Sequence, residues 1–190
     1  MALKKTLTIA GSDTSAGAGM QADLKTFQEL GTYGIVALTS IVTMDKASWS
    51  HDVTPIPFDV FEKQLETAIS IGPDAVKTGM LGTQEIIKRA GEAYVESGAN
   101  YFVVDPVMVC KGENEVLNPG NTDAMIEYLL PKATVVTPNL FEAGQLANLG
   151  TLKSIDDMKK AAEIIHQQGA KHVIIKGGKA LDQDKSYDLY

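Results

Sequence analysis

The sequence predicts an α/β protein in which helices cover both faces of a mostly parallel central sheet. Strand-like and helix-like segments alternate along nearly the whole chain, and short connections join them. Three of the strand-like segments are continuously apolar, namely residues 102–104, 135–136 and 173–175. Such runs are typical of parallel strands that are buried on both faces. We therefore expect a three-layer α/β/α architecture.

Each element has its own signal. Segments rich in β-branched and apolar residues predict strands over 3–10, 33–44, 74–77, 101–104, 133–136 and 171–176. Apolar residues at steps of four, three and three predict a helix from Met20 to Leu30, which Gly31 ends. An alternating stretch at 186–190 predicts another strand, and further helices are expected to begin at Pro57, Thr83, Asn121, Asn139 and Ser154. Ligands of such sheets bind beyond the carboxyl ends of the strands, so function is sought in those loops.

Composition limits the class of protein. The 190 residues are 44% hydrophobic and 22% charged, as in a single globular domain spanning 1–190. The net charge of −7 argues against nucleic acid as the main partner, because a polyanion would be repelled. The lone cysteine, Cys110, permits no internal disulfide and no cysteine-built metal site. Its single occurrence favours a reducing cytosol, and no apolar run reaches the ~20 residues of a membrane span. The sequence therefore indicates a cytoplasmic protein with no membrane partner.

The first candidate site is the loop Gly-Ser-Asp-Thr-Ser-Ala-Gly-Ala-Gly at residues 11–19, which precedes a helix. Small residues let the backbone approach a ligand closely, and a helix amino end favours negative or hydrogen-bond-accepting groups. The loop differs from a dinucleotide fingerprint, because six residues separate Ala10 from Gly17. It also lacks the Gly-Lys-Ser/Thr of a P-loop. A flexible turn rich in capping residues is the alternative.

Two more candidates lie in one loop, at residues 105–112. Asp105 ends a strand and is followed by proline, so its carboxylate is placed either to hold a metal or phosphate or to close a turn. Cys110 stands beside Lys111, which favours the thiolate form. Most lone cysteines are instead inert small apolar residues.

The remaining candidates lie at the ends of the predicted strands 133–136 and 171–176. Asn139 and Glu142 have the spacing of a capping box, and the Glu142 carboxylate also suits a Mg²⁺-phosphate site. Lys176 ends a strand and precedes Gly177-Gly178-Lys179-Ala180. An ammonium and free backbone N–H groups in that order are suited to phosphate oxygens, with a plain turn as the alternative.

Six motifs carry a resemblance that covers residues 4–190. They are Ala10-Gly11-Ser12-Asp13, the run 17–27, Lys77-Thr78-Gly79-Met80-Leu81-Gly82, Asp105-Pro106-Val107-Met108, Thr137-Pro138-Asn139-x-x-Glu142-Ala143 and Lys176-Gly177-Gly178. Together they resemble the hydroxymethylpyrimidine kinase/pyridoxal kinase family and are highly specific for it. The resemblance implies the ribokinase-like fold and an ATP-dependent kinase of small molecules.

Two positions make the chain most similar to the pyridoxal (pyridoxine) kinase branch of Gram-positive bacteria. Met44 stands where pyrimidine kinases of the family carry a glutamine that reads the aminopyrimidine. Cys110 matches a cysteine that adds to the substrate aldehyde as a hemithioacetal in the resembled pyridoxal kinases. The resemblance thus implies phosphorylation of the 5′-hydroxymethyl group of pyridoxal, pyridoxine or pyridoxamine in vitamin B6 salvage. A hydroxymethylpyrimidine (phosphate) kinase of thiamine biosynthesis and a non-catalytic B6-vitamer-binding protein are the alternatives.

The resemblance also assigns roles to individual residues. The implied metal is Mg²⁺, which Asp105 and Glu142 would organise through water, and Lys176 would neutralise phosphate charge. The implied substrate pocket is Asp13, Ala18, Gly19, Met44, Met80, Val107 and Cys110. The implied ATP side is Asn139, Glu142, Lys176, Gly177, Gly178, Lys179, Ala180 and Asp188.

Members of the resembled family are longer than this sequence and commonly form homodimers. Beyond the point where this sequence ends they carry a Gly-Thr-Gly-[Cys/Asp] motif, which supplies the anion hole and the catalytic base. No such motif occurs in the 190 residues. We therefore expect the amino-terminal portion of a single kinase domain without its main base, and activity from the full-length domain rather than from this portion alone.

Overall fold

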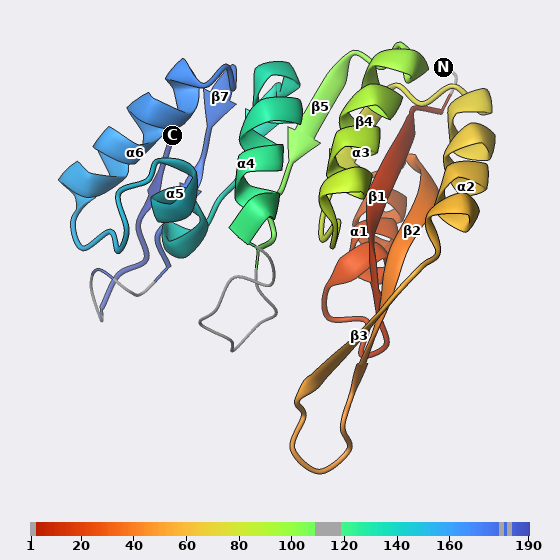
Figure 1. Cartoon of the computed structure of the whole chain (residues 1–190), viewed down its shortest axis with the longest axis horizontal. Coiled ribbons are helices and arrows are strands. Elements are labelled where there is room, and N and C mark those ends of the chain that lie inside the picture. Colours follow the sequence, from red (N-terminus) through yellow and green to blue (C-terminus); the bar gives the residue numbers. More distant parts are fainter. Residues whose placement is uncertain (1–2, 109–118, 179–180, 182–183) are drawn as a thin grey trace.

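A computed structural model describes residues 3–108, 119–178, 181 and 184–190. Within them, seven strands form one sheet in the order β3-β2-β1-β4-β5-β6-β7 (Figure 1). Neighbouring strands are parallel apart from β2 and β3, which are antiparallel. The strands are β1 (Lys5–Asp13), β2 (Tyr33–Met44), β3 (His51–Pro55), β4 (Ala75–Thr78), β5 (Tyr101–Val104), β6 (Val135–Val136) and β7 (His172–Val173).

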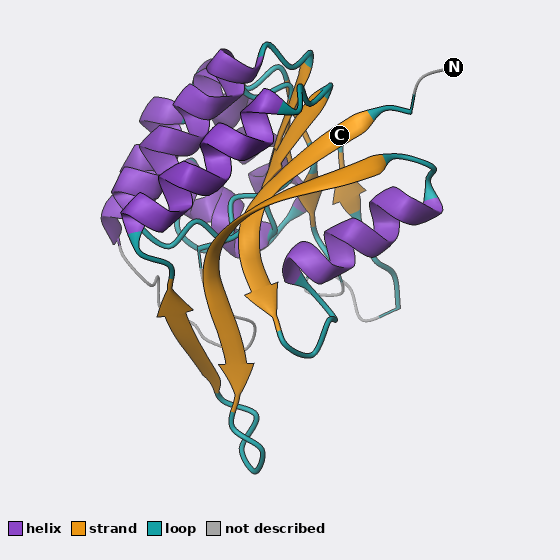
Figure 2. Cartoon of the chain, turned by 90° about the vertical axis from the view of Figure 1, so that its right-hand side faces the viewer, coloured by secondary structure: helices purple, strands orange, loops and turns teal. Residues whose placement is uncertain are grey.

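Helices lie on both faces of this sheet. Figure 2 shows α1 on one face, while α2, α3 and α4 lie on the opposite face. In the part of the chain that the structure describes, no helix is long and apolar enough to cross a membrane. The expected three-layer fold with a mostly parallel sheet is confirmed. The helices are α1 (Gly19–Glu29), α2 (Phe58–Ser70), α3 (Gln84–Ser97), α4 (Pro119–Tyr128), α5 (Leu140–Leu146) and α6 (Ile155–Gln167), with a 3₁₀ turn at Leu130–Lys132.

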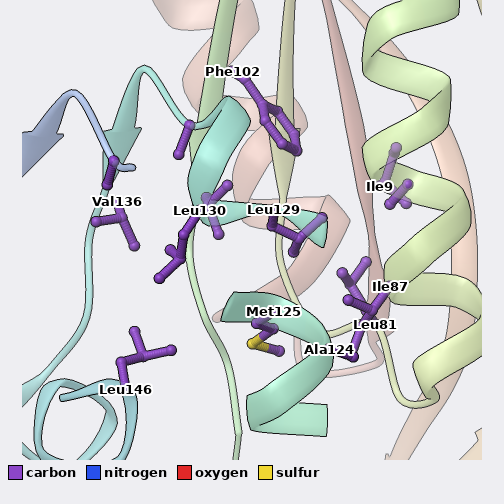
Figure 3. Packing of buried hydrophobic residues seen from close by; sticks show 14 of the residues in the cluster. Ile9, Leu81, Ile87, Phe102, Ala124, Met125, Leu129, Leu130, Val136 and Leu146 are labelled. Atoms are coloured by element: carbon purple, nitrogen blue, oxygen red, sulfur yellow. The ribbon is translucent and has the colours of Figure 1, made fainter. Parts of the chain in front are cut away.

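The apolar strands and the faces of α2, α3 and α4 form the hydrophobic core. Phe102 of β5 is fully buried and stacks on Tyr94 of α3, with 4.5 Å between the ring centroids. Figure 3 shows Ile87 of α3 and Met125 of α4 near Leu81, which precedes α3. Burial of this apolar surface is the main force that holds α2–α4 on the sheet.

Helix α1 is attached differently, because none of its residues is fully buried. Asp23 accepts a hydrogen bond from the Thr8 hydroxyl at 2.6 Å and pairs with the Lys77 ammonium at 3.0 Å. The Asp23 and Lys77 side chains are 16% and 21% exposed. The Leu24 side chain also occupies the space that a Cβ on Gly34 would need. A charged contact thus fixes the helix that follows the glycine-rich loop.

Several strand boundaries differ from the prediction by one to three residues, and three differences go further. The single strand expected over 171–176 is wrong, because these residues divide between β7 and β8 (Ile175–Lys176). Strand β8 pairs with β9 (Asp188–Leu189) in a separate two-stranded sheet. Strand β1 continues to Asp13, into the segment expected to be loop, and β3 was not predicted.

Strands β2 and β3 form a hairpin that extends beyond the rest of the molecule (Figures 1 and 2). Its turn is held by Asp45, whose carboxylate accepts from the backbone N–H groups of Ala47 and Ser48 at 2.9 and 2.8 Å. Trp49 closes the turn by donating its N–H to the Asp45 carbonyl at 2.9 Å, and its side chain is exposed. Met44 lies at the base of this turn.

Candidate functional site

Most of the sequence-predicted site residues lie where parallel strands of the main sheet end. Two groups can be distinguished, and both names are kept below. The glycine-loop group lies at the carboxyl ends of β1 and β4 and in the loops that follow them, and it contains Asp13, Ala18, Gly19 and Met80. The carboxylate–lysine cluster lies at and beyond the carboxyl ends of β5, β6 and β8, and it contains Asp105, Thr137, Asn139, Glu142 and Lys176.

Asp13 organises the glycine-loop group from its buried position at the end of β1. One carboxylate oxygen accepts from the N–H and the hydroxyl of Ser15, both at 2.8 Å. The other accepts from the N–H of Ala18 at 2.8 Å. Burial alone would raise the pKa of Asp13, but hydrogen bonds from Ser15, Ala18 and Gly17 hold that pKa below its ordinary value. The loop is therefore built around an ionised carboxylate.

Gln21 and Gly19 fix the start of α1 against the end of β1. The Gln21 side chain accepts from the Asp13 N–H at 2.9 Å and donates to the Ser12 hydroxyl at 2.6 Å. Gly19 has φ +60°, and a Cβ there would lie 2.5 Å from the Gly11 carbonyl oxygen. Ala18 caps α1 without a side-chain hydrogen bond, so the helix amino end keeps backbone N–H groups for a ligand.

The other three described residues of the implied substrate pocket come from three different strand ends. Met80 follows β4, and its methyl group lies close to Gly11. Val107 follows β5 and donates its N–H to the Asp105 carbonyl at 2.9 Å. Met44 lies two residues beyond Val42, which is the register partner of Asp13. Met44 therefore reaches the hairpin, beyond the main part of the sheet.

The carboxylate–lysine cluster brings together residues from three strand ends. One oxygen of Asp105 accepts from the Lys176 ammonium at 3.0 Å and from the Thr137 hydroxyl at 3.2 Å. Asn139 and Glu142 form the predicted capping box of α5, with reciprocal bonds of 2.8 and 2.9 Å. The capping role of Glu142 is compatible with a role in a Mg²⁺-phosphate site, because a capping carboxylate still has further lone pairs.

Glu142 is the most strongly perturbed acid in the described chain. Burial is the main cause and the negative charge of Asp105 a smaller one, and together they raise its pKa to a net value of about 7. The Asn139 N–H and the positive charge of Lys176 act in the opposite direction. A cation bound nearby would stabilise the ionised form of such a carboxyl group, which is buried beside a second carboxylate.

The glycines after Lys176 are held by β9. Gly177 donates its N–H to the Asp188 carboxylate at 3.1 Å and packs directly on the Tyr187 carbonyl. Gly178 has φ +56°, which few other residues adopt readily. Asp188 therefore shapes this loop.

Three predicted site residues, Cys110, Lys179 and Ala180, lie outside the described residues, so their roles stay predictions. Two other residues make contacts within the site but were not foreseen. Gln21 and Thr137 were not predicted as site residues. Thr137 directly follows the buried strand β6, so its hydroxyl at a strand end was a usable signal.

The cluster suits a magnesium ion only in combination with phosphate. Among the described residues, no group of three or more His, Cys, Asp or Glu side chains is placed to hold a metal. Mg²⁺ commonly uses one or two protein carboxylates together with waters and substrate phosphates. Asp105 and Glu142 meet that requirement, because they lie close enough for the charge of one to raise the pKa of the other.

Comparison with known proteins identifies the class and then the family. The three-layer fold with its site at the strand ends is that of the ribokinase-like kinases of small molecules. The family model for phosphomethylpyrimidine kinase matches residues 13–190. The chain belongs to the phosphomethylpyrimidine kinase family.

Individual relatives are similar along the whole chain. A putative pyridoxine kinase of Staphylococcus aureus (strain COL) is 85% identical over 190 residues, which are 100% of this chain and 69% of that protein. The hydroxymethylpyrimidine/phosphomethylpyrimidine kinase of Bacillus subtilis (strain 168) is 43% identical over 190 residues, again 100% and 69%.

Solved structures give the same picture. The pyridoxal kinase from Staphylococcus aureus in complex with ADP matches with a TM-score of 0.96 and 83% identity, covering 100% of this chain and 69% of that one. The same enzyme in complex with pyridoxal matches with a TM-score of 0.96 and 82% identity, with the same coverage.

Proposed function

We propose that this chain belongs to an ATP:pyridoxal 5′-phosphotransferase, which phosphorylates the 5′-hydroxymethyl group of pyridoxal, pyridoxine or pyridoxamine in vitamin B6 salvage. The observation that carries the proposal is the carboxylate–lysine cluster at the strand ends, where Lys176 meets Asp105 at 3.0 Å beside the buried Glu142. The Staphylococcus aureus relatives compared above, which are named pyridoxine or pyridoxal kinase, are 82–85% identical. Within Bacillus subtilis, the pyridoxine kinase is 54% identical, against 43% for the hydroxymethylpyrimidine/phosphomethylpyrimidine kinase.

The geometry suggests how the cluster binds nucleotide. We propose that the Lys176 ammonium exchanges Asp105 for phosphate oxygens and neutralises their charge. Asp105 and Glu142 would organise Mg²⁺ through water, and the ion would screen charge on the transferred phosphoryl group. Gly177 and Gly178 bring backbone close to the phosphates, with Asn139, Lys179, Ala180 and Asp188 completing the ATP side.

The glycine-loop group supports substrate binding. Asp13 holds Ser15 and Ala18 in place, and the start of α1 at Gly19 offers N–H groups to the polar edge of a pyridine ring. Met44 and Met80 would pack on the ring, and backbone groups near Val107 would also meet its polar edge. Cys110 would add reversibly to the pyridoxal aldehyde as a hemithioacetal.

We further propose that the protein is cytoplasmic, that residues 1–190 belong to a single kinase domain, and that this domain forms a homodimer. The first rests on the use of one cysteine, and the other two rest on family membership.

Binding and turnover are tested separately, because the chain spans 69% of the length of the relatives compared above. We expect calorimetric titration of the chain to show saturable binding of pyridoxal and of AMP-PCP. ADP formation is then measured with pyridoxal or hydroxymethylpyrimidine as acceptor, with the longer Staphylococcus aureus enzyme as the reference. Tighter binding of hydroxymethylpyrimidine than of pyridoxal would contradict the proposal. Pyridoxal binding without nucleotide binding would favour a non-catalytic vitamer-binding protein.

A further inference from the structure

The register between strands β1 and β2 shifts beside the loop that follows β4 and contains Met80. The shift falls at Gly11, so Thr39 and Ser40 of β2 together stand opposite this one residue of β1. Two residues against one constitute a β-bulge, a feature that redirects side chains and is frequent next to active sites. The bulge lies between two segments of the glycine-loop group, and none of its β2 residues was singled out by sequence motifs.

The bulge directs the Thr39 hydroxyl at the loop that follows β4. Thr39 is 1% exposed, and its Oγ1 donates to the Met80 carbonyl at 2.6 Å. The Thr39 carbonyl itself accepts from the Ile56 N–H at 2.9 Å. The side-chain amide of Gln64 in α2 bonds to both backbone groups of Leu38, the residue before Thr39. It accepts from the Leu38 N–H at 2.9 Å and donates to the Leu38 carbonyl at 3.1 Å. Thr39 is therefore fixed before it contacts Met80.

The Ser40 and Met80 side chains leave no room for a side chain on Gly11. A Cβ on Gly11 would lie 2.8 Å from the Ser40 hydroxyl oxygen and 3.0 Å from the Met80 methyl carbon. Ser40 is 2% exposed, and its hydroxyl has no hydrogen-bond partner in the structure. A buried polar atom without a partner lowers stability, so packing alone does not account for this arrangement. We name Gly11, Thr39, Ser40 and Met80 the bulge wall.

We propose that Thr39 is a positioning residue for the binding of the vitamin ring. Its hydroxyl fixes the Met80 backbone, and the absence of a Cβ at Gly11 leaves the space that the Met80 methyl group occupies. The bulge wall thereby sets affinity for the ring, whereas the carboxylate–lysine cluster sets affinity for the nucleotide. This inference rests on the proposed function, because Met80 is a substrate contact only if the chain binds B6 vitamers.

The experiment compares Thr39→Val, which keeps the shape and removes the hydroxyl, with Thr39→Ser, which keeps the hydroxyl. Calorimetry gives the Kd for pyridoxal and for AMP-PCP, and thermal unfolding gives Tm. We expect Thr39→Val to raise the Kd for pyridoxal about 5- to 30-fold, because the Met80 carbonyl loses its partner. The Kd for AMP-PCP should stay within about 2-fold, and Thr39→Ser should restore most of the pyridoxal affinity. Thr54→Val, on the exposed part of β3, is the matched control.

Each alternative outcome is distinct. Absence of pyridoxal binding by the parent chain contradicts the proposed function itself. Parent binding with an unchanged pyridoxal Kd in Thr39→Val overturns the positioning role. Equal weakening of pyridoxal and AMP-PCP together with a lower Tm also overturns it, because that pattern is a general loss of structure. If Thr39→Val does not fold, Gly11→Ala takes its place: it should displace the Met80 methyl group and weaken pyridoxal selectively, and an unchanged Kd overturns the proposal.

Discussion

Lys176 and Asp105 lie 71 residues apart in the sequence, yet their side chains meet at 3.0 Å where β8 and β5 end. The lysine side chain is 46% exposed and the aspartate side chain 25%. A pair with this exposure contributes little to folding, because solvent screens it. The contact therefore costs little to break when a phosphate group competes for the ammonium, which is the property that a nucleotide site requires.

Replacing this lysine should weaken nucleotide binding without unfolding the protein. We expect Lys176→Gln to raise the Kd for AMP-PCP roughly 10- to 100-fold, the range for one charge-assisted hydrogen bond. Tm should change little. Lys159→Gln removes a somewhat more exposed lysine from α6, where its partner is Asp156, and should leave the Kd unchanged. Equal Kd values for the two variants would show that Lys176 does not meet the phosphates.

Glu142 should make the stability of the chain depend on pH. Its pKa is about 7 in the folded chain against an ordinary value of 4.5, so the folded state holds this proton more tightly than the unfolded state. The resulting stabilisation is complete below pH 4.5 and is lost as the pH rises to about 7, by roughly 3 kcal/mol. In Glu142→Gln this loss should disappear, while the amide oxygen still accepts from the Asn139 N–H.

Urea unfolding at several values between pH 5 and pH 8 measures this effect as the difference between parent and Glu142→Gln. Because the two proteins share all other titrating groups, the contributions of those groups to the free energy of unfolding cancel in that difference. A difference that stays constant over this range would mean that Glu142 titrates near its ordinary pKa in the folded chain.

The glycine at the start of α1 should be irreplaceable for steric reasons. Gly19→Ala places a Cβ 2.5 Å from the Gly11 carbonyl oxygen and strains a backbone with φ +60°. Gly72→Ala imposes similar strain at φ +73° but meets no atom within 4 Å. We expect Gly19→Ala to cost about 2 kcal/mol more in free energy of unfolding than Gly72→Ala, whose cost is about 1 kcal/mol. Similar losses in both variants would assign the effect to backbone strain alone.

The contact that attaches α1 should be a large contributor to stability for a charged group. Asp23→Asn leaves the Lys77 ammonium without its carboxylate in a mostly buried position, and we expect a loss of about 2 kcal/mol in urea unfolding. Asp156→Asn removes an exposed partner of Lys159 and should cost less than about 0.5 kcal/mol. If Asp23→Asn is as stable as Asp156→Asn, then other contacts hold α1 on the sheet.

Much of the fold was predictable because parallel strands and their helices leave local signals. The apolar run at 102–104 became the buried centre of β5, and the Asn139–Glu142 spacing became a capping box with both bonds formed. The division of 171–176 was not predictable, because the register of β8 is set by Asp188 and Leu189 of β9, which come later in the chain. Strand β3 was missed because its five residues are mostly polar or exposed and pair only with β2.

The positions of several candidate site residues in the fold were also predictable. Residues at strand ends, such as Asp105 and Lys176, were found from the topology that the sequence implies. The contact between Thr39 and the Met80 carbonyl joins residues 41 positions apart. It depends on a single extra residue in β2, for which no local pattern exists. Interactions created by register shifts are therefore the part of the site that requires coordinates.

The β2–β3 hairpin also gives the protein a built-in optical probe. Trp49 is the sole tryptophan of the chain, and it is 65% exposed in the turn that follows Met44. Emission excited at the indole band therefore comes from this one turn. Any ligand that orders or covers the hairpin should shift that emission, so the approach of a vitamer to Met44 can be followed in real time without a label or a substitution.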